Sequence, residues 1–285
     1  MRCYRVRMPD VALVTGTSSG MGLHAAVELA RRGLTVVATM RDTARAGALR
    51  DAAEASGVVL DVRALDVVDH AAAEALVQAV AADHGRIDVL VNNAGRGCVG
   101  TAEQLPMDVI RDQLEVNYLA AVHLAKLVLP GMRERRHGRI VTVTSVGGAV
   151  GQPFADAYCG AKFAVEGFMQ SLAPVVEPFG VRVSVVEPAA VASEFVANVE
   201  RPAEVGAYGA QLDAYLARAS GAFAGAQTAA EAGAAIADAA TSEDYRFRWQ
   251  TSEAAVRFVG ASLADLDGER VLGVTRTWVA GQPGA

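Results

Sequence analysis

A glycine-rich segment at residues 15–22, with the sequence TGTSSGMG, most constrains the fold of this chain. It follows a short apolar run at residues 11–14, which predicts a buried strand, and it precedes a helical pattern at residues 23–30. Glycine is favoured where a chain turns tightly or where its backbone approaches a ligand closely. The start of a helix also favours negative charge, because its backbone N–H groups are unpaired there. The order strand, glycine loop, helix therefore predicts a site for the pyrophosphate of a dinucleotide.

Strand and helix patterns alternate through most of the remaining chain. Further strands are predicted at residues 34–39, 58–65, 87–91, 139–144, 181–186 and 245–250. Helices are predicted at residues 71–82, 106–131, 155–180, 203–226 and 231–240. Such alternation is typical of a parallel sheet with right-handed crossovers. We therefore expect an α/β fold: a single Rossmann-like doubly wound domain over residues 10–280, with a parallel seven-stranded sheet and helices on both faces.

Three residues between positions 145 and 162 can carry proton transfer. Ser145 follows the strand predicted at residues 139–144, and open α/β sheets bind ligands at this carboxyl edge. Tyr158 and Lys162 are four residues apart, so on a helix they lie on the same face. A positive charge beside a phenol favours the phenolate, and we expect Lys162 to lower the pKa of Tyr158 from its ordinary value of about 10. Pairs with this spacing are also common on helix surfaces, so other parts of the chain must decide between the two interpretations.

Two further polar signals accompany this stretch. The sequence NNAG at residues 92–95 follows the strand predicted at residues 87–91, and it is typical of a turn that lies flat against a ligand. Asn117 falls inside the helix predicted at residues 106–131. Asparagine is a poor helix former, so Asn117 is a candidate for a functional role.

The end of the second predicted strand bears on the choice of nicotinamide cofactor. In NAD-binding folds of this kind an acidic residue near this position holds the ribose hydroxyls. Here the strand is followed by Arg41 and then Asp42. A guanidinium is suited to a 2′-phosphate, so we expect NADP(H) to be favoured over NAD(H). Asp42 argues for NAD(H), and Arg41 could instead be a solvated loop residue.

Charge and cysteine content exclude several other classes of protein. The net charge of −6 argues against a partner nucleic acid. The three cysteines (Cys3, Cys98 and Cys159) are odd in number and lack metal-ligand spacing, so we expect reduced thiols, no metal site and a cytoplasmic location. We expect residues 1–9 to be an N-terminal leader without the apolar core of a secretory signal, and no segment to span a membrane.

Together the motifs at residues 15–22 and 92–95, with Asn117, Ser145, and the pair Tyr158 and Lys162, resemble the short-chain dehydrogenase/reductase family. The resemblance covers about residues 10 to 260. Within the family, the segments GLHAAVELA, VVATMRD and SVGGAVGQPFADAYCGAKFAVEGF look most like the branch that contains estradiol 17β-hydroxysteroid dehydrogenase and the related retinol dehydrogenases. These segments belong to the framework and the cofactor site, so they do not define the substrate.

The resemblance implies a role for each residue of the set, and with it an NAD(P)-dependent enzyme that acts on CH–OH groups. Tyr158 would be the general acid in ketone reduction and the base in alcohol oxidation. Ser145 would stabilise charge on the substrate oxygen. Lys162 would hold the nicotinamide ribose and favour the phenolate, and Asn117 would keep in place a water that links Lys162 to solvent. The expected cofactor-binding residues are Gly16, Ser18, Ser19, Gly20, Met21, Gly22, Arg41, Asp66, Val67, Asn93, Ala94, Gly95, Tyr158, Lys162, Pro188, Val191 and Ser193.

The chain departs from the family pattern at one turn. Its sequence says least about function in the segment expected to cover the substrate. Family members usually carry glycine after Pro188, where this chain has Ala189. Alanine does not easily adopt a positive φ, so either the turn never needs it or the nicotinamide side is reshaped. The expected lid at about residues 194–227 is alanine-rich, which favours a bulky apolar ketone or alcohol such as a steroid, retinoid or polycyclic compound. Candidate pocket residues, each of which could also be a packing or surface residue, are Tyr208, Tyr215, Arg218 and Phe223.

Two alternative functions remain open at this stage. A reductase of a carrier-bound or polyketide β-keto intermediate would need a basic patch at the pocket mouth, and the lid supplies only Arg201 and Arg218. A catalytically silent, cofactor-sensing protein is the alternative from another class, and the intact catalytic set argues against it. From the family we also expect a homodimer or homotetramer. The apolar residues Phe163, Val165, Phe168 and Met169 suit such an interface, although a core-facing stripe would look the same.

Overall fold

The computed structural model describes residues 9–192, 206–264 and 277. Its central element is a seven-stranded sheet in the order β3-β2-β1-β4-β5-β6-β9, in which all neighbouring strands are parallel. The strands are β1 (Val11–Thr15), β2 (Thr35–Met40), β3 (Asp61–Ala64), β4 (Val89–Asn92), β5 (Gly138–Val143), β6 (Val181–Glu187) and β9 (Arg248–Gln250). This confirms the predicted fold class. The strand order changes direction between β1 and β4, which is where open α/β sheets bind ligands.

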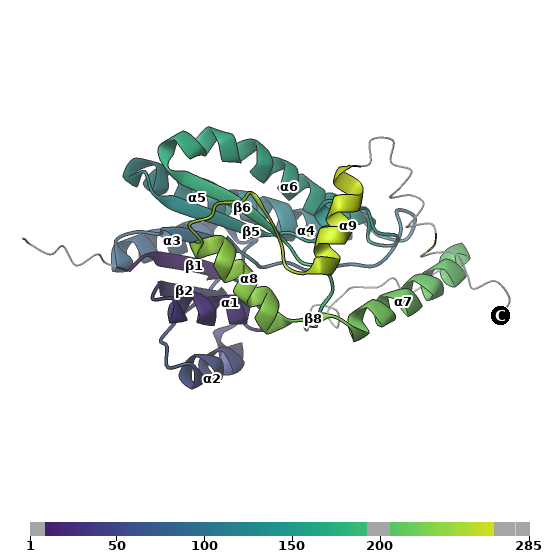
Figure 1. Cartoon of the computed structure of the whole chain (residues 1–285), viewed down its shortest axis with the longest axis horizontal. Helices are drawn as coiled ribbons and strands as arrows, with labels where there is room; N and C mark the ends of the chain where they lie inside the picture. Colours follow the sequence, from purple (N-terminus) through teal and green to yellow (C-terminus); the bar gives the residue numbers. More distant parts are fainter. Residues whose placement is uncertain (1–8, 193–205, 265–276, 278–285) are drawn as a thin grey trace, which may run out of the picture.

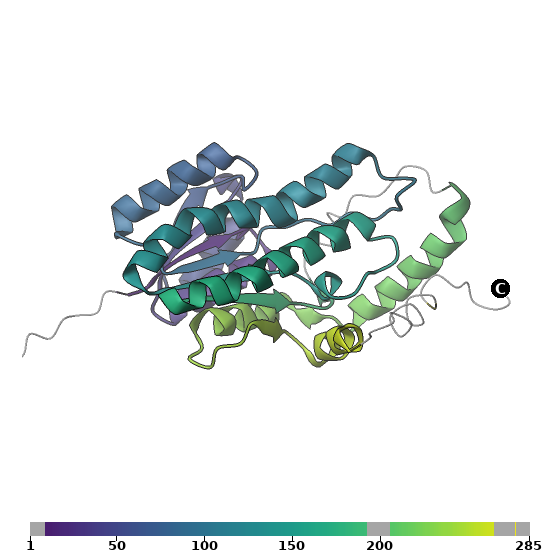
Figure 2. The same ribbon diagram turned by 90° about the horizontal axis from the view of Figure 1, so that it is seen from above.

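Helices cover both faces of the sheet (Figures 1 and 2). One layer contains α1 (Gly20–Arg31), α2 (Gly47–Ala55) and α8 (Ala229–Thr241). The other contains α3 (His70–His84), α4 (Met107–Leu114), α5 (Ala120–Arg135) and α6 (Asp156–Val176). Helix α8 packs so closely on α1 that a Cβ atom on Gly233 would lie 2.6 Å from the Cβ of His24.

Two apolar clusters fill the space between the sheet and these helix layers. Neighbouring residues of a strand point to opposite faces, so Leu13 belongs to one cluster and Val14 to the other. Because both faces are covered, β1 is buried at every position and apolar from Val11 to Val14 rather than alternating, which is the pattern seen in the sequence. The apolar stripe of α6 is divided: Val165 and Met169 are fully buried in the core, whereas Phe163 is 45% exposed.

Several elements differ from those predicted. The helix expected at residues 106–131 is two helices, α4 and α5, joined by a π-helical turn at Glu115–Leu119. The predicted elements do not include α2, α9 (Glu253–Leu263), or the small parallel sheet of β7 (Val191–Ala192) and β8 (Gln227–Thr228). Short 3-10 turns lie at Thr43–Arg45, Val146–Gly148, Glu177–Phe179 and Gly206–Tyr208.

Helix α7 (Gly209–Ala224) accounts for most of the helix predicted at residues 203–226. It extends away from the sheet beyond the carboxyl ends of the strands, and α9 stands near the same edge (Figures 1 and 2). Residues 194–205 of the expected lid lie outside the described residues. In the described part of the chain, no helix combines the length and the apolar character needed to cross a bilayer.

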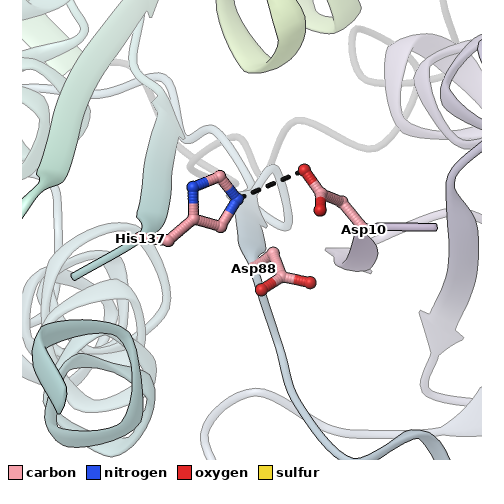
Figure 3. A group of neighbouring side chains, drawn as sticks. All are labelled: Asp10, Asp88 and His137. Carbon is pink, nitrogen blue, oxygen red and sulfur yellow. Dashed lines mark hydrogen bonds and ion pairs between the residues drawn. The ribbon is translucent and has the colours of Figure 1, made fainter. Parts of the chain in front are cut away.

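At the opposite, amino-terminal edge of the sheet, Asp10, Asp88 and His137 lie together (Figure 3). Each precedes a strand: β1, β4 and β5, respectively. His137 Nε2 lies 3.2 Å from the Asp10 carboxylate, and the Asp88 carboxylate accepts a 2.9 Å hydrogen bond from the Val11 N–H. Arg86 forms ion pairs with Asp10 at 3.2 Å and with Asp88 at 2.7 Å. The cluster therefore joins the starts of three strands, and its carboxylates already have a guanidinium partner.

Candidate active site

Hydrogen bonds join the glycine loop to the NNAG turn. The Asn93 side-chain amide donates 2.9 Å hydrogen bonds to the carbonyl oxygens of Thr15 and Gly16. In return, Thr15 Oγ1 accepts 3.0 Å hydrogen bonds from the backbone N–H groups of Asn93 and Ala94. Gly16 has φ +70°, and a Cβ atom there would lie 2.8 Å from Ala94 Cα. The two motifs thus form one surface at the carboxyl ends of β1 and β4.

The start of α1 fits the predicted pyrophosphate. The Ser19 side chain does not cap the helix, so the first N–H groups of α1 are available to an anion. Gly20 has φ +61°, and a Cβ atom on Gly22 would lie only 2.2 Å from Asn93 Nδ2, so neither position readily accepts a side chain. The loop, which includes Ser18 and Met21, is fixed to β2 by Thr17, whose N–H and hydroxyl both donate to the Thr39 carbonyl, at 3.0 and 3.1 Å.

The ends of β2 and β3 present an arginine and two aspartates. Arg41 is exposed and has no hydrogen-bond or ion-pair partner among residues 9–192, 206–264 and 277. Asp42 is occupied locally, because its carboxylate accepts a 2.9 Å hydrogen bond from the Ala44 N–H and caps a 3-10 turn. Beside β3, exposed Asp66 accepts a 3.3 Å hydrogen bond from the Val68 N–H, and Val67 is buried. Of these charged groups, the Arg41 guanidinium is the one left open to a ligand.

Ser145, Tyr158 and Lys162 meet at the carboxyl end of β5. The Ser145 hydroxyl accepts a 3.0 Å hydrogen bond from the Gly147 N–H and is also hydrogen-bonded to Tyr158. Lys162 Nζ donates a 3.0 Å hydrogen bond to the Val143 carbonyl and lies 5.8 Å from the centroid of the Tyr158 ring. Lys162 is only 5% exposed, so it is not a solvated residue of the helix surface.

The expected lowering of the Tyr158 pKa is not found. Burial raises the pKa of Tyr158 well above its ordinary value, and the hydrogen bond with Ser145 opposes this only in part. Burial also lowers the pKa of Lys162 to about 8, against the effect of the negative charge on Glu166. The prediction was therefore wrong for these protein groups, because loss of water disfavours the phenolate and the charge of Lys162 does not offset it. Tyr158 is a neutral phenol at neutral pH and can act as a proton donor.

Asn117 lies in the π-helical turn and is 3% exposed. Its amide nitrogen donates to the Arg96 carbonyl at 2.9 Å and to Gln113 Oε1 at 3.0 Å, while its oxygen accepts from the Arg96 N–H at 3.3 Å. A Cβ atom on Gly95 would lie 2.8 Å from Asn117 Oδ1 and 3.6 Å from Lys162 Nζ, so these three residues are neighbours. Local π-helical turns are frequent at functional sites, in line with the role suspected from the sequence.

One buried carboxylate beside this set, Glu166, was missed in the sequence. It lies four residues after Lys162 on α6 and is 3% exposed. Its oxygens accept hydrogen bonds from Thr144 Oγ1 at 2.5 Å and from Arg248 Nη1 at 2.7 Å. Burial raises the pKa of Glu166 to about 7. The signal that could have found it is spacing, since Tyr158, Lys162 and Glu166 recur every four residues on one helix face.

A cavity of about 1840 Å³ opens onto these groups. Its lining includes Ser145, Tyr158 and Lys162, and also Tyr215 and Arg218 of α7. The Tyr215 ring also packs against Phe154, with 5.7 Å between the ring centroids. Two of the four candidate pocket residues therefore reach the cavity.

The other two candidate pocket residues are not seen in the cavity wall. Tyr208 is hydrogen-bonded to Glu103 and does not line the cavity, and the side chain of Phe223 is outside the described residues.

The turn after β6 reaches the same cavity. Pro188, Ala189 and Val191 line it, whereas Ser193 lies outside the described residues. Ala189 does not have a positive φ; within the described ranges only Arg136 and Phe154 do so among residues other than glycine. The turn therefore does not need the glycine that the family usually has there.

Comparisons with known proteins agree with this arrangement. Residues 10–204 match the family described as short chain dehydrogenase. The chain is 44% identical over 191 residues to retinol dehydrogenase 8 of Homo sapiens, covering 66% of this chain and 60% of that protein. It is 42% identical over 195 residues to 17-beta-hydroxysteroid dehydrogenase type 1 of Homo sapiens, covering 66% of this chain and 59% of that protein. The matches thus span about three fifths of these relatives.

Solved structures with the same fold are also similar in sequence. A short-chain dehydrogenase from Streptomyces avermitilis is 32% identical, covers 94% of this chain and 97% of its own, and superposes with a TM-score of 0.80. A metagenomic short-chain oxidoreductase in complex with NADP is 27% identical, covers 85% of this chain and 96% of its own, and has a TM-score of 0.67.

Proposed function

The chain belongs to the short-chain dehydrogenase family, and from this premise we propose that it is an NADP(H)-dependent oxidoreductase of ketones and secondary alcohols. The observation that carries the proposal is the meeting of Ser145, Tyr158 and Lys162 on a cavity that begins beside the glycine loop. In this proposal Tyr158 is a neutral proton donor beside the nicotinamide, which would bind along the carboxyl edge of the sheet and supply the hydride.

In this proposal each residue of the site has a separate role in the reaction. Tyr158 gives its proton to the substrate oxygen during ketone reduction and accepts it during alcohol oxidation. Ser145, whose hydroxyl is hydrogen-bonded to Tyr158, contacts the same oxygen and stabilises charge on it. Lys162 presents an ammonium group that the Val143 carbonyl holds in position, and Asn117, its neighbour across Gly95, would connect Lys162 to solvent through water.

The geometry around β2 supports NADP(H) over NAD(H). The exposed Arg41 guanidinium is open to a 2′-phosphate, whereas the Asp42 carboxylate is used as a cap for the Ala44 N–H. Asp66 and Val67, at the end of the neighbouring strand, are proposed to face the adenine. The related metagenomic oxidoreductase, which has NADP bound, adds to this support.

We propose a bulky apolar substrate, of the steroid, retinoid or polycyclic kind. Away from the cofactor edge, the cavity lining includes residues of α7 and α9, among them the apolar Leu216 and Phe258. The names of the two human relatives, a retinol dehydrogenase and a hydroxysteroid dehydrogenase, point the same way. A homodimer or homotetramer is proposed as well, and exposed Phe163 on α6 is available for such a contact.

The decisive experiment is a spectrophotometric assay of the purified protein with NADPH or NADH and a panel of carbonyl compounds. The panel should include a steroid ketone, a retinal, a polycyclic ketone, a small aliphatic ketone and a β-keto thioester. We expect NADPH oxidation with at least one of the bulky apolar compounds and the highest kcat/KM among them. A clear preference for the β-keto thioester would overturn the substrate proposal, and a lack of turnover with every compound would overturn the proposed activity. Light scattering of the same preparation tests the oligomer.

A further inference from the structure

Behind Lys162 lies a network of buried polar side chains that the proposed chemistry does not use. Glu166 on α6 is 3% exposed, and Glu187 at the end of β6 is fully buried. Arg248 on β9 lies between them: its Nη1 is 2.7 Å from Glu166 Oε2 and also bonds to Glu187 Oε1. Gln250 Nε2 donates a 2.5 Å hydrogen bond to the other oxygen of Glu187. Three elements that are distant in the sequence, α6, β6 and β9, thus place two carboxylates around one guanidinium.

This network is connected to the active site through the end of β5. Thr144 donates to Glu166 Oε1 at 2.5 Å, and it lies between two residues of the site. The residue before it, Val143, accepts the hydrogen bond from Lys162 Nζ, and the residue after it is Ser145. Glu166, through the Thr144 hydroxyl, and Lys162, through the Val143 carbonyl, therefore hold neighbouring residues at the end of β5 from the same face of α6. A shift of Glu166 would move Ser145 relative to the helix that carries Tyr158 and Lys162.

The charges in this network indicate that Glu166 can provide a negative charge near Lys162. Arg248 supplies one positive charge to two buried carboxylates, so one negative charge remains in the network above the pKa of Glu166, which is about 7. The charged or titratable groups around Glu166 are Lys162 and Tyr158 on its own helix, Glu187 on β6 and Arg248 on β9. Among these, Lys162 is the cation one helical turn away that lacks a carboxylate in direct contact among the described residues. A buried ammonium is unstable without a nearby negative charge.

We propose that Glu166 is a positioning residue of the active site, which serves as the buried counter-charge of Lys162 and fixes the end of β5 against α6. Its importance for turnover rests on the function proposed above, but the electrostatic effect on Lys162 does not. The negative charge of Glu166 favours the charged form of Lys162, whose pKa burial otherwise lowers. Glu187 shares the same arginine, but it lies on β6, bonded to Arg248 and Gln250, and not on the helix that carries Lys162.

The chain offers a direct readout, because Lys126 and Lys162 are its only lysines. Protein labelled with ε-13C-lysine should give two resonances, and exposed Lys126 is the internal reference. We would titrate both resonances between pH 6 and 11 in the wild type, in Glu166→Gln and in Glu187→Gln. Glu187→Gln is the matched control, because it removes a buried carboxylate from the same arginine. Thermal unfolding of each variant confirms that the titrations refer to folded protein.

In the wild type we expect the midpoint of Lys162 to lie near pH 8. In Glu166→Gln it should fall by about one pH unit or more, the usual effect of losing a nearby opposite charge. In Glu187→Gln it should stay close to the wild-type value. The inference is overturned if Glu166→Gln leaves the midpoint unchanged, or if both variants lower it equally.

A measurement on the wild type keeps the test valid if Glu166→Gln does not fold. The pKa of Glu166 is raised to about 7, so the Lys162 resonance should show a smaller step near pH 7 before its own titration. A single-step curve at both lysines would overturn the inference. Since neither readout requires a substrate, a failed activity assay combined with a shifted Lys162 midpoint would refute the proposed function and leave this inference intact.

Discussion

The side-chain amide of Asn93 donates a 2.9 Å hydrogen bond to the carbonyl oxygen of Gly16. A second hydrogen bond of the same length goes to the carbonyl of Thr15, so the residue after β4 holds both residues at the end of β1. The conformation of the glycine loop therefore depends on contacts outside the loop. Its backbone is positioned by a motif that enters the sheet from the neighbouring strand.

Replacement of Asn93 by alanine should weaken cofactor binding and destabilise the fold. Two hydrogen bonds are lost, which is about 1–3 kcal/mol of unfolding free energy at about 0.5–1.5 kcal/mol each. Fluorescence titration with NADPH and urea unfolding measure the two effects. Asn93→Asp should be at least as damaging, because it turns a carboxylate toward two carbonyl oxygens. An Asn93→Ala protein that binds NADPH as tightly as the wild type would show that the loop is stable without this contact.

Gly22→Ala should be strongly unfavourable, because the new Cβ would lie 2.2 Å from Asn93 Nδ2 and 2.3 Å from the Gly16 carbonyl oxygen. Overpacking of this kind costs roughly 1–3 kcal/mol or more. Gly160→Ala is the matched control on α6, where a Cβ would meet no atom within 4 Å. It should stabilise the helix by roughly 0.5–1 kcal/mol. Urea unfolding compares the two variants, and similar effects from both would contradict the steric argument.

Tyr158→Phe should remove most of the turnover and keep cofactor binding. The ring still packs in the cavity wall, but the proton donor is gone, and general acid catalysis is worth about 10²- to 10⁴-fold in rate. We therefore expect kcat to fall by that factor with the best ketone of the panel. The dissociation constant of NADPH, measured by fluorescence, should change little. Near-normal rates in this variant would rule out Tyr158 as the proton donor.

Arg41→Ala should reduce the preference for NADPH over NADH. A charge-assisted hydrogen bond contributes about 1.5–3 kcal/mol, so kcat/KM for NADPH should fall by roughly 10- to 100-fold while that for NADH stays similar. Arg50→Ala on α2 removes the same charge from an exposed position in the same layer and serves as the control. An unchanged cofactor preference in Arg41→Ala, or an equal change in Arg50→Ala, would assign the selectivity to other residues.

The stability of the protein should depend on the ionisation of Glu166. Burial raises the pKa of this carboxyl from 4.5 to about 7, so the folded state favours its neutral form. Its contribution to stability is complete below pH 4.5 and is lost as the pH rises through 7. From pH 5 to pH 7 this loss is on the order of 2 kcal/mol.

Glu166→Gln should lack this part of the pH dependence, since glutamine stays neutral. Urea unfolding at each pH gives the two profiles, and the difference between them isolates Glu166 because other groups contribute to both. Glu253→Gln, at a side chain that is 95% exposed, should follow the wild type. Parallel profiles for the wild type and Glu166→Gln would mean that Glu166 does not titrate in this range.

The parts of the fold that could be predicted are those whose signal is local. Each of the seven strands is a short run bounded by turn residues, and the alternation with helices is sufficient to predict a parallel sheet. The residues at strand ends could be predicted for the same reason. Once β1, β4 and β5 are parallel neighbours, Gly16, Asn93 and Ser145 must lie at one edge.

The parts that could not be predicted depend on contacts between distant residues. Glu166 and Arg248 are far apart in the sequence, and β9 brings them together only after the sheet has formed. The raised pKa of Tyr158 is likewise a property of its burial, which the spacing to Lys162 does not reveal. The branch of the family could be identified, yet the substrate could not, since the lid residues carry few polar groups to constrain it.

The π-helical turn that contains Asn117 joins α4 to α5, and it makes the exact number of residues between these two helices important. An α-helix advances about 100° per residue, so the extra residue in this turn sets the two flanking helices out of phase by about that angle. A helical wheel drawn continuously through α4 and α5 would therefore assign the wrong face to one of them. Deleting one residue to straighten the helix would rotate either Asn117 away from Gly95 or the fully buried Gln113 out of the core. An insertion or deletion in a surface helix is often accommodated at the ends of the helix. Here it would displace a side chain of the site, because the position of Asn117 depends on the number of residues in the turn.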